Sequence, residues 1–202
     1  MRRDSWGDCD RVETAIKLPL GTVAPGFRLP DPDGKPVSLD DFPSASALIV
    51  VFLCNHCPYV KHVQKSFTQL AREYQARGVA VVAINSNDVE TYPEDRPEKM
   101  AEEIQVHGYT FPYLYDETQD VAKAYGAACT PDFFLFDKDR RLAYRGQYDA
   151  SRPKNGLPVT GADLRAALDA ALEGRPQPAD QKPSVGCSIK WKKNAAKIAG
   201  QQ

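Results

Sequence analysis

Hydrophobic and polar positions along the chain alternate between short apolar runs and longer stretches with one apolar face. Residues 47–53 are continuously apolar and rich in β-branched side chains, which predicts a strand buried on both faces. Residues 58–78 carry apolar side chains at spacings of three and four, which predicts a helix that stops at Gly78. A second buried strand follows over residues 79–84. This order of strand, helix and strand implies a parallel pair joined by a right-handed crossover.

Turn residues mark the other elements. Residues 31–34 read Asp-Pro-Asp-Gly between two short apolar segments, 25–29 and 36–39, and so predict an N-terminal β-hairpin. Residues 133–136 and 142–145 flank a second turn and predict an antiparallel hairpin late in the chain.

Capping residues predict three further helices. In the first, Asp95 and Glu98 act as a capping pair with Pro97 in the opening turn, and the helix ends near Gly108. The other two are a short helix capped by Asp116 that ends at Gly126, and a last helix opened by Thr160 or Asp163 that ends near Gly174.

The chain of 202 residues has a size that favours one domain with one core. We expect an N-terminal arm over residues 1–19, the folded domain over 20–176 and a C-terminal tail over 177–202. The hydrophobic content of 42% is typical of a globular protein, and the formal net charge of −1 gives no footprint for nucleic acid or an anionic membrane.

The roles open to the cysteines depend on the cellular compartment that the sequence predicts. The longest apolar run is too short to span a bilayer, and the basic first residues are not followed by the apolar region of a secretory signal. We therefore expect a cytoplasmic protein with no membrane partner. Structural disulfides are disfavoured in that compartment, so each of the five cysteines is catalytic, metal-binding or inert.

Cys57 occupies the most informative position, because it follows a buried strand and directly precedes the helix that Pro58 begins. Free N–H groups and the positive end of the helix dipole stabilise a thiolate there, and can lower a cysteine pKa from ~8.5 to roughly 3.5–7.5. The positive form of His56 would add to this effect. We expect Cys57 to be a nucleophilic thiolate open to solvent; the alternative is a thiol that only packs beneath the sheet.

Cys54 lies three residues before Cys57 and completes a C-x-x-C pair beside a strand–helix–strand unit. Such a pair is a redox signature, because the two sulfurs can meet without large backbone movement. Cys54 could equally point into the core, and the sequence leaves both possibilities open.

Three segments carry a resemblance to a known family: Cys129-Thr130-Pro131, residues 52–60 (Phe-Leu-Cys-Asn-His-Cys-Pro-Tyr-Val) and residues 186–192 (Gly-Cys-Ser-Ile-Lys-Trp-Lys). The chain resembles the thioredoxin-like superfamily, in its peroxiredoxin-like/redoxin (AhpC/TSA-related) branch. The resemblance implies an α/β thioredoxin-like fold, with a central mixed β-sheet flanked by helices, an N-terminal β-hairpin and a C-terminal tail.

The same resemblance implies a substrate-binding region around Cys57. In it, Thr130-Pro131 is a cis-proline step that faces the redox cysteine, and the Thr130 backbone binds extended disulfide or peptide partners. The remaining substrate-binding residues would be His56, Pro58 and Tyr59, with Tyr59 at the rim of the site.

Two departures from related patterns affect the expected activity. Val60 stands where thioredoxin carries its resolving cysteine, and Cys54 stands where peroxiredoxins carry a threonine that orients peroxide. Arg145 is a poorly placed candidate for the arginine that peroxiredoxins pair with their thiolate. Disulfide exchange is therefore favoured over rapid peroxide reduction, since exchange needs only a thiolate, a resolving thiol and access.

The resolving thiol remains open at this point. Cys54 is the first candidate by proximity, and Cys187 is the second, because a tail after a flexible linker could fold over the site. Cys129 is a third candidate beside Pro131, and we expect no role for Cys9.

The sequence thus predicts a thiol–disulfide oxidoreductase with catalytic Cys57 and either Cys54 or Cys187, and with no cofactor or metal. Its partners would be a protein or small-molecule disulfide and an external thiol reductant, without nucleic acid. Thiol peroxidase (antioxidant) activity is one alternative. A non-catalytic partner- or metal-binding module is another, with ligands drawn from His56, His62, His107, Cys54 and Cys57.

Overall fold

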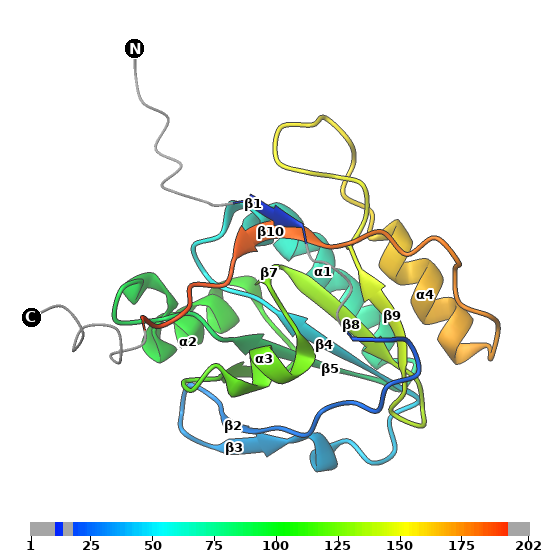
Figure 1. The fold of residues 1–202 in the computed structure, drawn as a ribbon, viewed down its shortest axis with the longest axis horizontal. Helices are drawn as coiled ribbons and strands as arrows, with labels where there is room; N and C mark the ends of the chain where they lie inside the picture. Colours follow the sequence, from blue (N-terminus) through cyan, green and yellow to red (C-terminus); the bar gives the residue numbers. More distant parts are fainter. Residues whose placement is uncertain (1–10, 14–17, 194–202) are drawn as a thin grey trace, which may run out of the picture.

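A five-stranded mixed sheet forms the centre of the protein (Figure 1). The computed structural model describes residues 11–13 and 18–193. The strand order is β6-β5-β4-β8-β9, and the bounds are Ala47–Phe52 (β4), Val79–Asn85 (β5), Tyr113–Tyr115 (β6), Asp132–Phe136 (β8) and Leu142–Gly146 (β9). β4 pairs in parallel with β5, and β8 pairs antiparallel with β4 and β9. The predicted parallel pair and the late hairpin are therefore confirmed.

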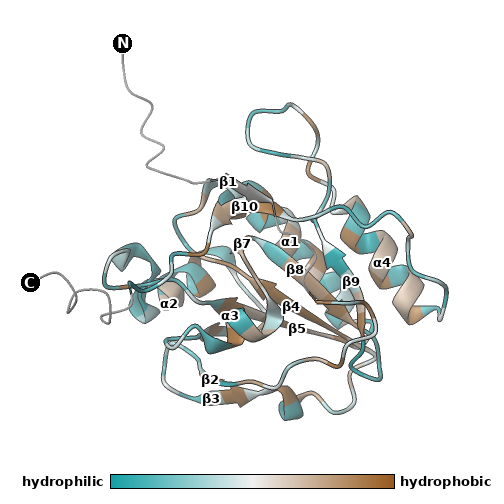
Figure 2. Ribbon diagram, in the orientation of Figure 1, coloured by the Kyte–Doolittle hydropathy of each residue, from teal (hydrophilic) through white to brown (hydrophobic). Residues whose placement is uncertain are grey.

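Helices and a hairpin cover the two faces of this sheet. One face packs against α1 (Pro58–Gln75), α2 (Pro97–His107) and α4 (Ala162–Leu172). The other packs against α3 (Asp120–Tyr125) and the hairpin of β2 (Arg28–Pro30) and β3 (Pro36–Ser38). Two short 3₁₀ helices, Leu39–Asp41 (η1) and Pro93–Asp95 (η2), lie in connections. Figure 2 shows the strongest hydropathy along β4 and β5, as expected for strands buried on both faces.

A second, smaller sheet lies beside the start of α1. It has the order β1-β10-β7, with bounds Arg11–Glu13 (β1), Val185–Ser188 (β10) and Cys129–Thr130 (β7). Both pairings are antiparallel, and Cys187 stands opposite Thr130. No strand was predicted in the tail, yet β10 lies between β1 and β7 and packs against α1 (Figure 1).

The start of α1 follows the sequence pattern closely. Cys57 is the N-cap residue and Pro58 is the first helical residue, where the missing N–H of proline breaks no helical hydrogen bond. The buried face of the helix includes Val60, Val63 and Phe67. Gly78 follows the helix with a φ of +84°, a conformation that favours glycine.

The predicted caps have different outcomes. Arg96 is the N-cap of α2, so the predicted capping by Asp95 is wrong; Asp95 is instead fully buried with other partners. Gln119 is the N-cap residue of α3, although Asp116, the predicted cap, does accept the N–H of Ala122 in the first turn at 2.9 Å. Ahead of α4, it is Thr160 whose hydroxyl accepts the N–H of Ala162, at 3.3 Å.

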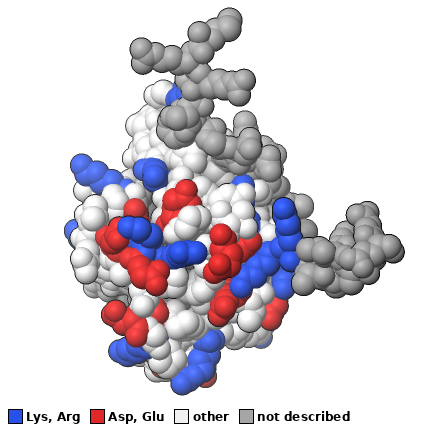
Figure 3. Space-filling model, turned by 90° about the vertical axis from the view of Figure 1, so that its left-hand side faces the viewer, with Lys and Arg blue, Asp and Glu red and all other residues white. Residues whose placement is uncertain are grey.

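The charged side chains are mixed over the surface. On the face that Figure 3 presents, basic and acidic groups alternate and neither sign covers it. Examples in α2 and α3 are the ion pairs Lys99–Glu102 and Lys123–Asp120. Within residues 11–13 and 18–193, we find no helix with the length and apolar character needed to cross a bilayer.

Candidate active site

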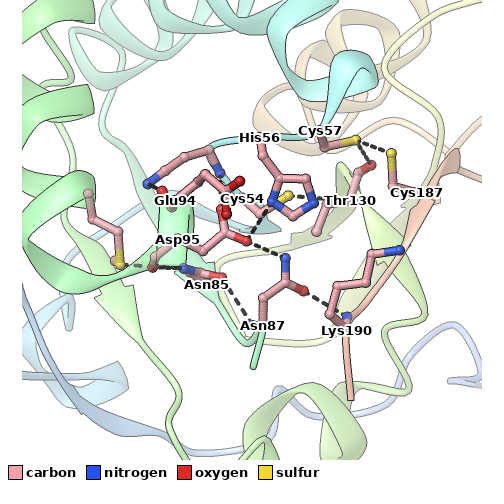
Figure 4. A network of polar contacts seen from close by, with 12 residues as sticks. Cys54, His56, Cys57, Asn85, Asn87, Glu94, Asp95, Thr130, Cys187 and Lys190 are labelled. Atoms are coloured by element: carbon pink, nitrogen blue, oxygen red, sulfur yellow. Dashed lines mark hydrogen bonds and ion pairs between the residues drawn. The ribbon is translucent and has the colours of Figure 1, made fainter. Parts of the chain in front are cut away.

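Cys57 lies where the main sheet and the small sheet meet, and it contacts residues of β7 and β10. It lies between the end of β4 and the first turn of α1, as the sequence predicts. Its Sγ is 2.7 Å from Cys187 Sγ and 3.1 Å from the carbonyl oxygen of Thr130 (Figure 4). The expected exposure is wrong, because the side chain of Cys57 is fully buried. The sulfur is enclosed because β10 packs against the start of α1 and brings Cys187 against it.

Hydrogen bonds favour the anionic form of Cys57. Burial alone would raise the pKa of this thiol, but four hydrogen bonds have a larger combined effect and lower it to about 6. They come from the Cys54 thiol, the backbone N–H groups of Val60 and Cys187, and the Thr130 hydroxyl. The Val60 amide is one of the free N–H groups in the first turn of α1, so the helix-start argument holds at atomic detail.

Cys54 has the opposite character. It is a free thiol at the end of the buried strand, and its Sγ is 3.1 Å from the hydroxyl oxygen of Thr130. Burial, the hydrogen bond to Cys57 and the negative charge of Asp95 all raise the pKa of Cys54. Cys54 therefore keeps its proton and can donate it in a hydrogen bond to the Cys57 thiolate.

The other two described cysteines lie in the small sheet. Cys187 is buried in β10 and is itself disulfide-bonded. Cys129 is a free, buried cysteine in β7, with its sulfur 3.7 Å from the carbonyl oxygen of Pro131. Cys9 lies outside the described residues.

Thr130 and Pro131 lie beside Cys54 and Cys57, as the family resemblance implied. The Thr130-Pro131 peptide bond is cis. Thr130 contacts Cys57 through its carbonyl oxygen and Cys54 through its hydroxyl, and its backbone pairs with Cys187. Its backbone edge is therefore already occupied by a strand of the same chain.

His56, Pro58 and Tyr59 also lie at the site. Nδ1 of His56 is 2.8 Å from Oδ2 of Asp95, and the imidazole stacks on the Tyr92 ring with a centroid separation of 5.3 Å. Pro58 and Tyr59 are partly buried, and Tyr59 lines a pocket together with Pro131 and Val185.

The pKa of His56 is raised by its neighbours. Burial opposes the charged imidazolium, but the hydrogen bond and negative charge of Asp95 have the larger effect, assisted by the charges of Cys57 and Glu94. A protonated His56 places positive charge beside the Cys57 thiolate, as the sequence analysis expected.

Asp95 belongs to the candidate site, although the sequence pattern predicted only a helix cap there. Its carboxylate accepts hydrogen bonds from the Asn55 N–H at 2.8 Å and from Asn87 Nδ2 at 2.7 Å, in addition to His56. Asn87 in turn accepts the N–H of Lys190 at 2.8 Å, which ties the chain after β10 to the same network (Figure 4). A signal was present in the sequence, because the polar run 85–88 directly follows a buried strand.

Arg145 does not serve Cys57. The guanidinium is buried, with Nη2 3.3 Å from Asp132 Oδ2 and 2.8 Å from the Gly126 carbonyl oxygen. Burial raises the pKa of Asp132 to about 6, although the positive charge of Arg145 opposes this. The pair supports the sheet behind the site.

The histidines proposed as metal ligands are dispersed. His62 contacts Ser151 and His107 pairs with Glu103, at 3.1 and 3.2 Å. In the part of the chain that the structure describes, the donor atoms of Cys54, His56 and Asp95 do come within 4.8 Å of one another. Asp95 Oδ2 already accepts hydrogen bonds from His56 and Asn87, and Cys54 Sγ contacts the Thr130 hydroxyl.

Comparison with known proteins gives consistent results. The model of the AhpC/TSA family matches residues 20–145. A crystal structure of an uncharacterized conserved protein from Geobacillus kaustophilus is 60% identical, covers 92% of this chain and 98% of that chain, and has a TM-score of 0.88. More distant solved structures include one described as a thiol:disulfide interchange protein DsbE of Chlorobium tepidum, with 24% identity, coverage of 77% of this chain and 99% of that chain, and a TM-score of 0.59; this likeness supports the thioredoxin-like fold.

Two curated relatives have names that indicate redox activity. Thiol-disulfide oxidoreductase ResA of Geobacillus thermodenitrificans is 30% identical over 130 residues, which cover 64% of this chain and 69% of the relative. A protein of Mycobacterium tuberculosis, named provisionally as a peroxiredoxin, is 32% identical over 111 residues, which cover 55% of this chain and 66% of the relative.

Proposed function

Because the chain belongs to the AhpC/TSA family, we propose that it is a thiol–disulfide oxidoreductase in which Cys57 is the nucleophile and Cys187 the resolving cysteine. One observation carries the proposal: a thiol with a pKa of about 6 lies 2.7 Å from the sulfur of a second cysteine. At neutral pH such a thiol is mostly thiolate, which is the form that attacks disulfides.

The proposed reaction has two exchange steps. The Cys57 thiolate attacks one sulfur of a substrate disulfide, a bond forms to Cys57 Sγ, and the other sulfur leaves as a thiolate that takes up a proton. The Cys187 thiolate then attacks Cys57 Sγ, forms a Cys57–Cys187 disulfide and releases the second substrate thiol. An external dithiol reduces that disulfide and, before the first turnover, the disulfide in which Cys187 already takes part.

The raised pKa of Cys54 and the 2.7 Å separation of Cys57 Sγ and Cys187 Sγ favour Cys187 over Cys54 in the second step. Cys54 is held in its protonated form by burial and by its hydrogen bond to Cys57. A protonated thiol is a poor nucleophile but a good hydrogen-bond donor. We therefore assign Cys54 to the stabilisation of the Cys57 thiolate, and Cys187 to resolution.

The test compares variants in which one cysteine is replaced. It measures disulfide reduction with dithiothreitol as the electron source. Cys57→Ser should abolish reduction of a small disulfide such as hydroxyethyl disulfide, whereas Cys129→Ser should retain the wild-type rate. Equal rates for the wild type and Cys57→Ser would contradict the proposal. Stoichiometric copper or zinc in the purified protein, lost in a Cys54/Cys57 double variant, would favour a metal-binding module instead.

Mass spectrometry after full reduction and mild reoxidation tests the resolving residue. We expect a Cys57–Cys187 linkage in the wild type and in Cys54→Ser, and no such linkage in Cys187→Ser. A predominant Cys54–Cys57 linkage in the wild type would assign resolution to Cys54 instead.

Thiol peroxidase activity is a variant of the same chemistry. It is the second activity to measure, because one relative is named as a peroxiredoxin. The Cys57 thiolate would attack one peroxide oxygen and become a sulfenic acid, with release of water or an alcohol. Cys187 would then displace water and form the same disulfide. Because Arg145 is engaged with Asp132, we expect peroxide reduction to be slower than disulfide exchange.

Disulfide substrates and an external dithiol are accordingly the partners that we propose. A cytoplasmic location, as expected from the sequence, would provide such a dithiol from the cellular thiol pool. The division of the chain at residues 19 and 176 likewise stays a prediction.

A further inference from the structure

Strand β10 occupies the edge of β7 on which an extended segment could bind next to Cys57. Cys187 pairs with Thr130, and Ser188 pairs with Cys129. The pairing continues beyond the strand, because the N–H of Ile189 donates to the carbonyl oxygen of Ala128 at 3.0 Å. A second extended polypeptide would need the same backbone groups, since addition of a strand depends on main-chain hydrogen bonds.

Gly186 makes this close approach possible. A Cβ atom on this residue would lie 2.1 Å from the carbonyl oxygen of Thr130 and 2.6 Å from its carbonyl carbon. Those atoms are backbone and cannot rotate away. The glycine before Cys187 is therefore a requirement for the docking of β10, and explains this part of the Gly-Cys motif in physical terms.

Anchors on both sides hold β10 in place. On its N-terminal side, the hydroxyl of Ser184 donates to the carbonyl oxygen of Gly146 at 2.7 Å. On its C-terminal side, the carbonyl oxygen of Lys190 accepts the Asp88 N–H at 2.8 Å and Gln119 Nε2 at 2.9 Å. Gln119 Oε1 also accepts the N–H of Lys192 at 2.9 Å. Displacement of the strand would disrupt all of these contacts.

We propose that β10 is a built-in occupant of the docking edge beside Cys57, and that it restricts this cysteine to small-molecule disulfides by excluding extended polypeptides. The proposal rests on the proposed function and names its substrate class. A small disulfide needs one sulfur to approach Cys57 Sγ, which requires the Cys187 side chain to move while the β10–β7 ladder stays intact. A polypeptide disulfide needs the Thr130 backbone as well, and so requires the ladder and its anchors to break.

The test measures substrate selectivity as the ratio of two reduction rates. One substrate is hydroxyethyl disulfide and the other is insulin, with dithiothreitol as the electron source. The variant is Gly186→Ala, which should prevent docking of β10. The matched control is Gly26→Ala, because Gly26 has open space around its Cβ position and no positive φ.

We expect the wild type and Gly26→Ala to prefer the small disulfide. Gly186→Ala should shift the ratio by about tenfold or more toward insulin, since loss of two strand hydrogen bonds is enough for such a change. Amide hydrogen exchange at residues 185–189 should accelerate in the same variant. An unchanged ratio together with accelerated exchange would overturn the proposal, as would a wild type that reduces both substrates equally well.

A second variant guards against a folding defect in Gly186→Ala. Gln119→Gly removes the anchors to Lys190 and Lys192, and glycine suits the φ of +65° at this position. It should shift the ratio in the same direction, and no shift despite faster exchange at β10 would count against the proposal. Cys57→Ser separates the two hypotheses. If this variant reduces hydroxyethyl disulfide at the wild-type rate, the proposed function fails. If it is inactive but Gly186→Ala and Gln119→Gly leave the substrate ratio unchanged, only the substrate restriction is rejected.

Discussion

Nδ1 of His56 lies 2.8 Å from Oδ2 of Asp95, and this contact fixes the imidazole beside the two cysteines at the start of α1. Asp95 comes from η2, whereas His56 lies between β4 and α1. The contact thus joins two connections that leave neighbouring parallel strands at their carboxyl ends, where sites in open α/β sheets are found.

The acidity of Cys57 should be directly measurable. Because its pKa is lowered to about 6, the thiolate should form as the pH rises through about 6, well below the ~8.5 of a free cysteine. The measurement is the ultraviolet absorbance of the thiolate against pH, taken as the difference between fully reduced wild type and Cys57→Ser. A midpoint near that of a free cysteine would contradict the hydrogen-bonding argument.

Cys54 should tune this acidity through its thiol proton. Cys54→Ala removes a hydrogen bond to the thiolate and should raise the pKa of Cys57 by about one unit or more, since a hydrogen bond to a charged group contributes about 1.5–3 kcal/mol. Cys54→Ser keeps a donor and should leave the pKa close to that of the wild type. The same absorbance titration checks both variants, and an equal shift in the two would assign the effect to packing.

Asp95→Asn should lower the pKa of His56. The wild-type pKa is raised chiefly by the hydrogen bond and charge of Asp95, which outweigh burial, and a neutral amide supplies neither the charge nor the same acceptor. NMR titration of the imidazole resonances provides the measurement, with His62→Gln and His107→Gln for assignment. An unchanged His56 titration would show that Asp95 is not the source of the shift.

Protonation of His56 should also appear in the pH dependence of stability. A group with a raised folded pKa stabilises the fold fully below its unfolded pKa of ~6.5, and this contribution disappears as the pH rises through the folded value. The difference in the free energy of unfolding between the wild type and His56→Gln should therefore be largest in acid and decrease above neutral pH. Urea titrations across this range test it, and a difference that grows with pH would contradict it.

Arg145→Met should destabilise the fold without changing the chemistry of Cys57. The variant leaves the buried carboxylate of Asp132 without its charged partner, which typically costs about 3–5 kcal/mol. Urea unfolding measures the loss, and the thiolate titration of Cys57 should remain at about 6. A raised Cys57 pKa in this variant would instead support a peroxiredoxin-like role for Arg145.

Local patterns explain why much of the fold could be predicted. β4 and β5 are continuous apolar runs, α1 has apolar side chains at helical spacing, and Pro58 marks the helix start that places Cys57. β7 is too short to carry a pattern, and the strand state of β10 depends on pairing with residues far away in the chain. These two strands were therefore missed.

Part of the candidate site could be predicted for the same reason. Cys57, Cys54 and Thr130 were identified because they stand at fixed positions beside regular elements. Asp95 was misassigned as a cap because Pro97 and Glu98 do mark the start of α2, but the N-cap is Arg96, one residue further along the chain. The true partners of Asp95 come from other segments. The burial of Cys57 was missed because the covering strand comes from the tail.

The middle position of β10 in its sheet links the two ends of the polypeptide. β1 pairs with one edge of β10 and β7 with the other, so a shift of β10 away from Thr130 must either take β1 with it or break a second ladder. β1 therefore holds β10 in place on the edge opposite Thr130. Removal of residues 1–13 would remove β1 and should weaken the packing of β10 over Cys57.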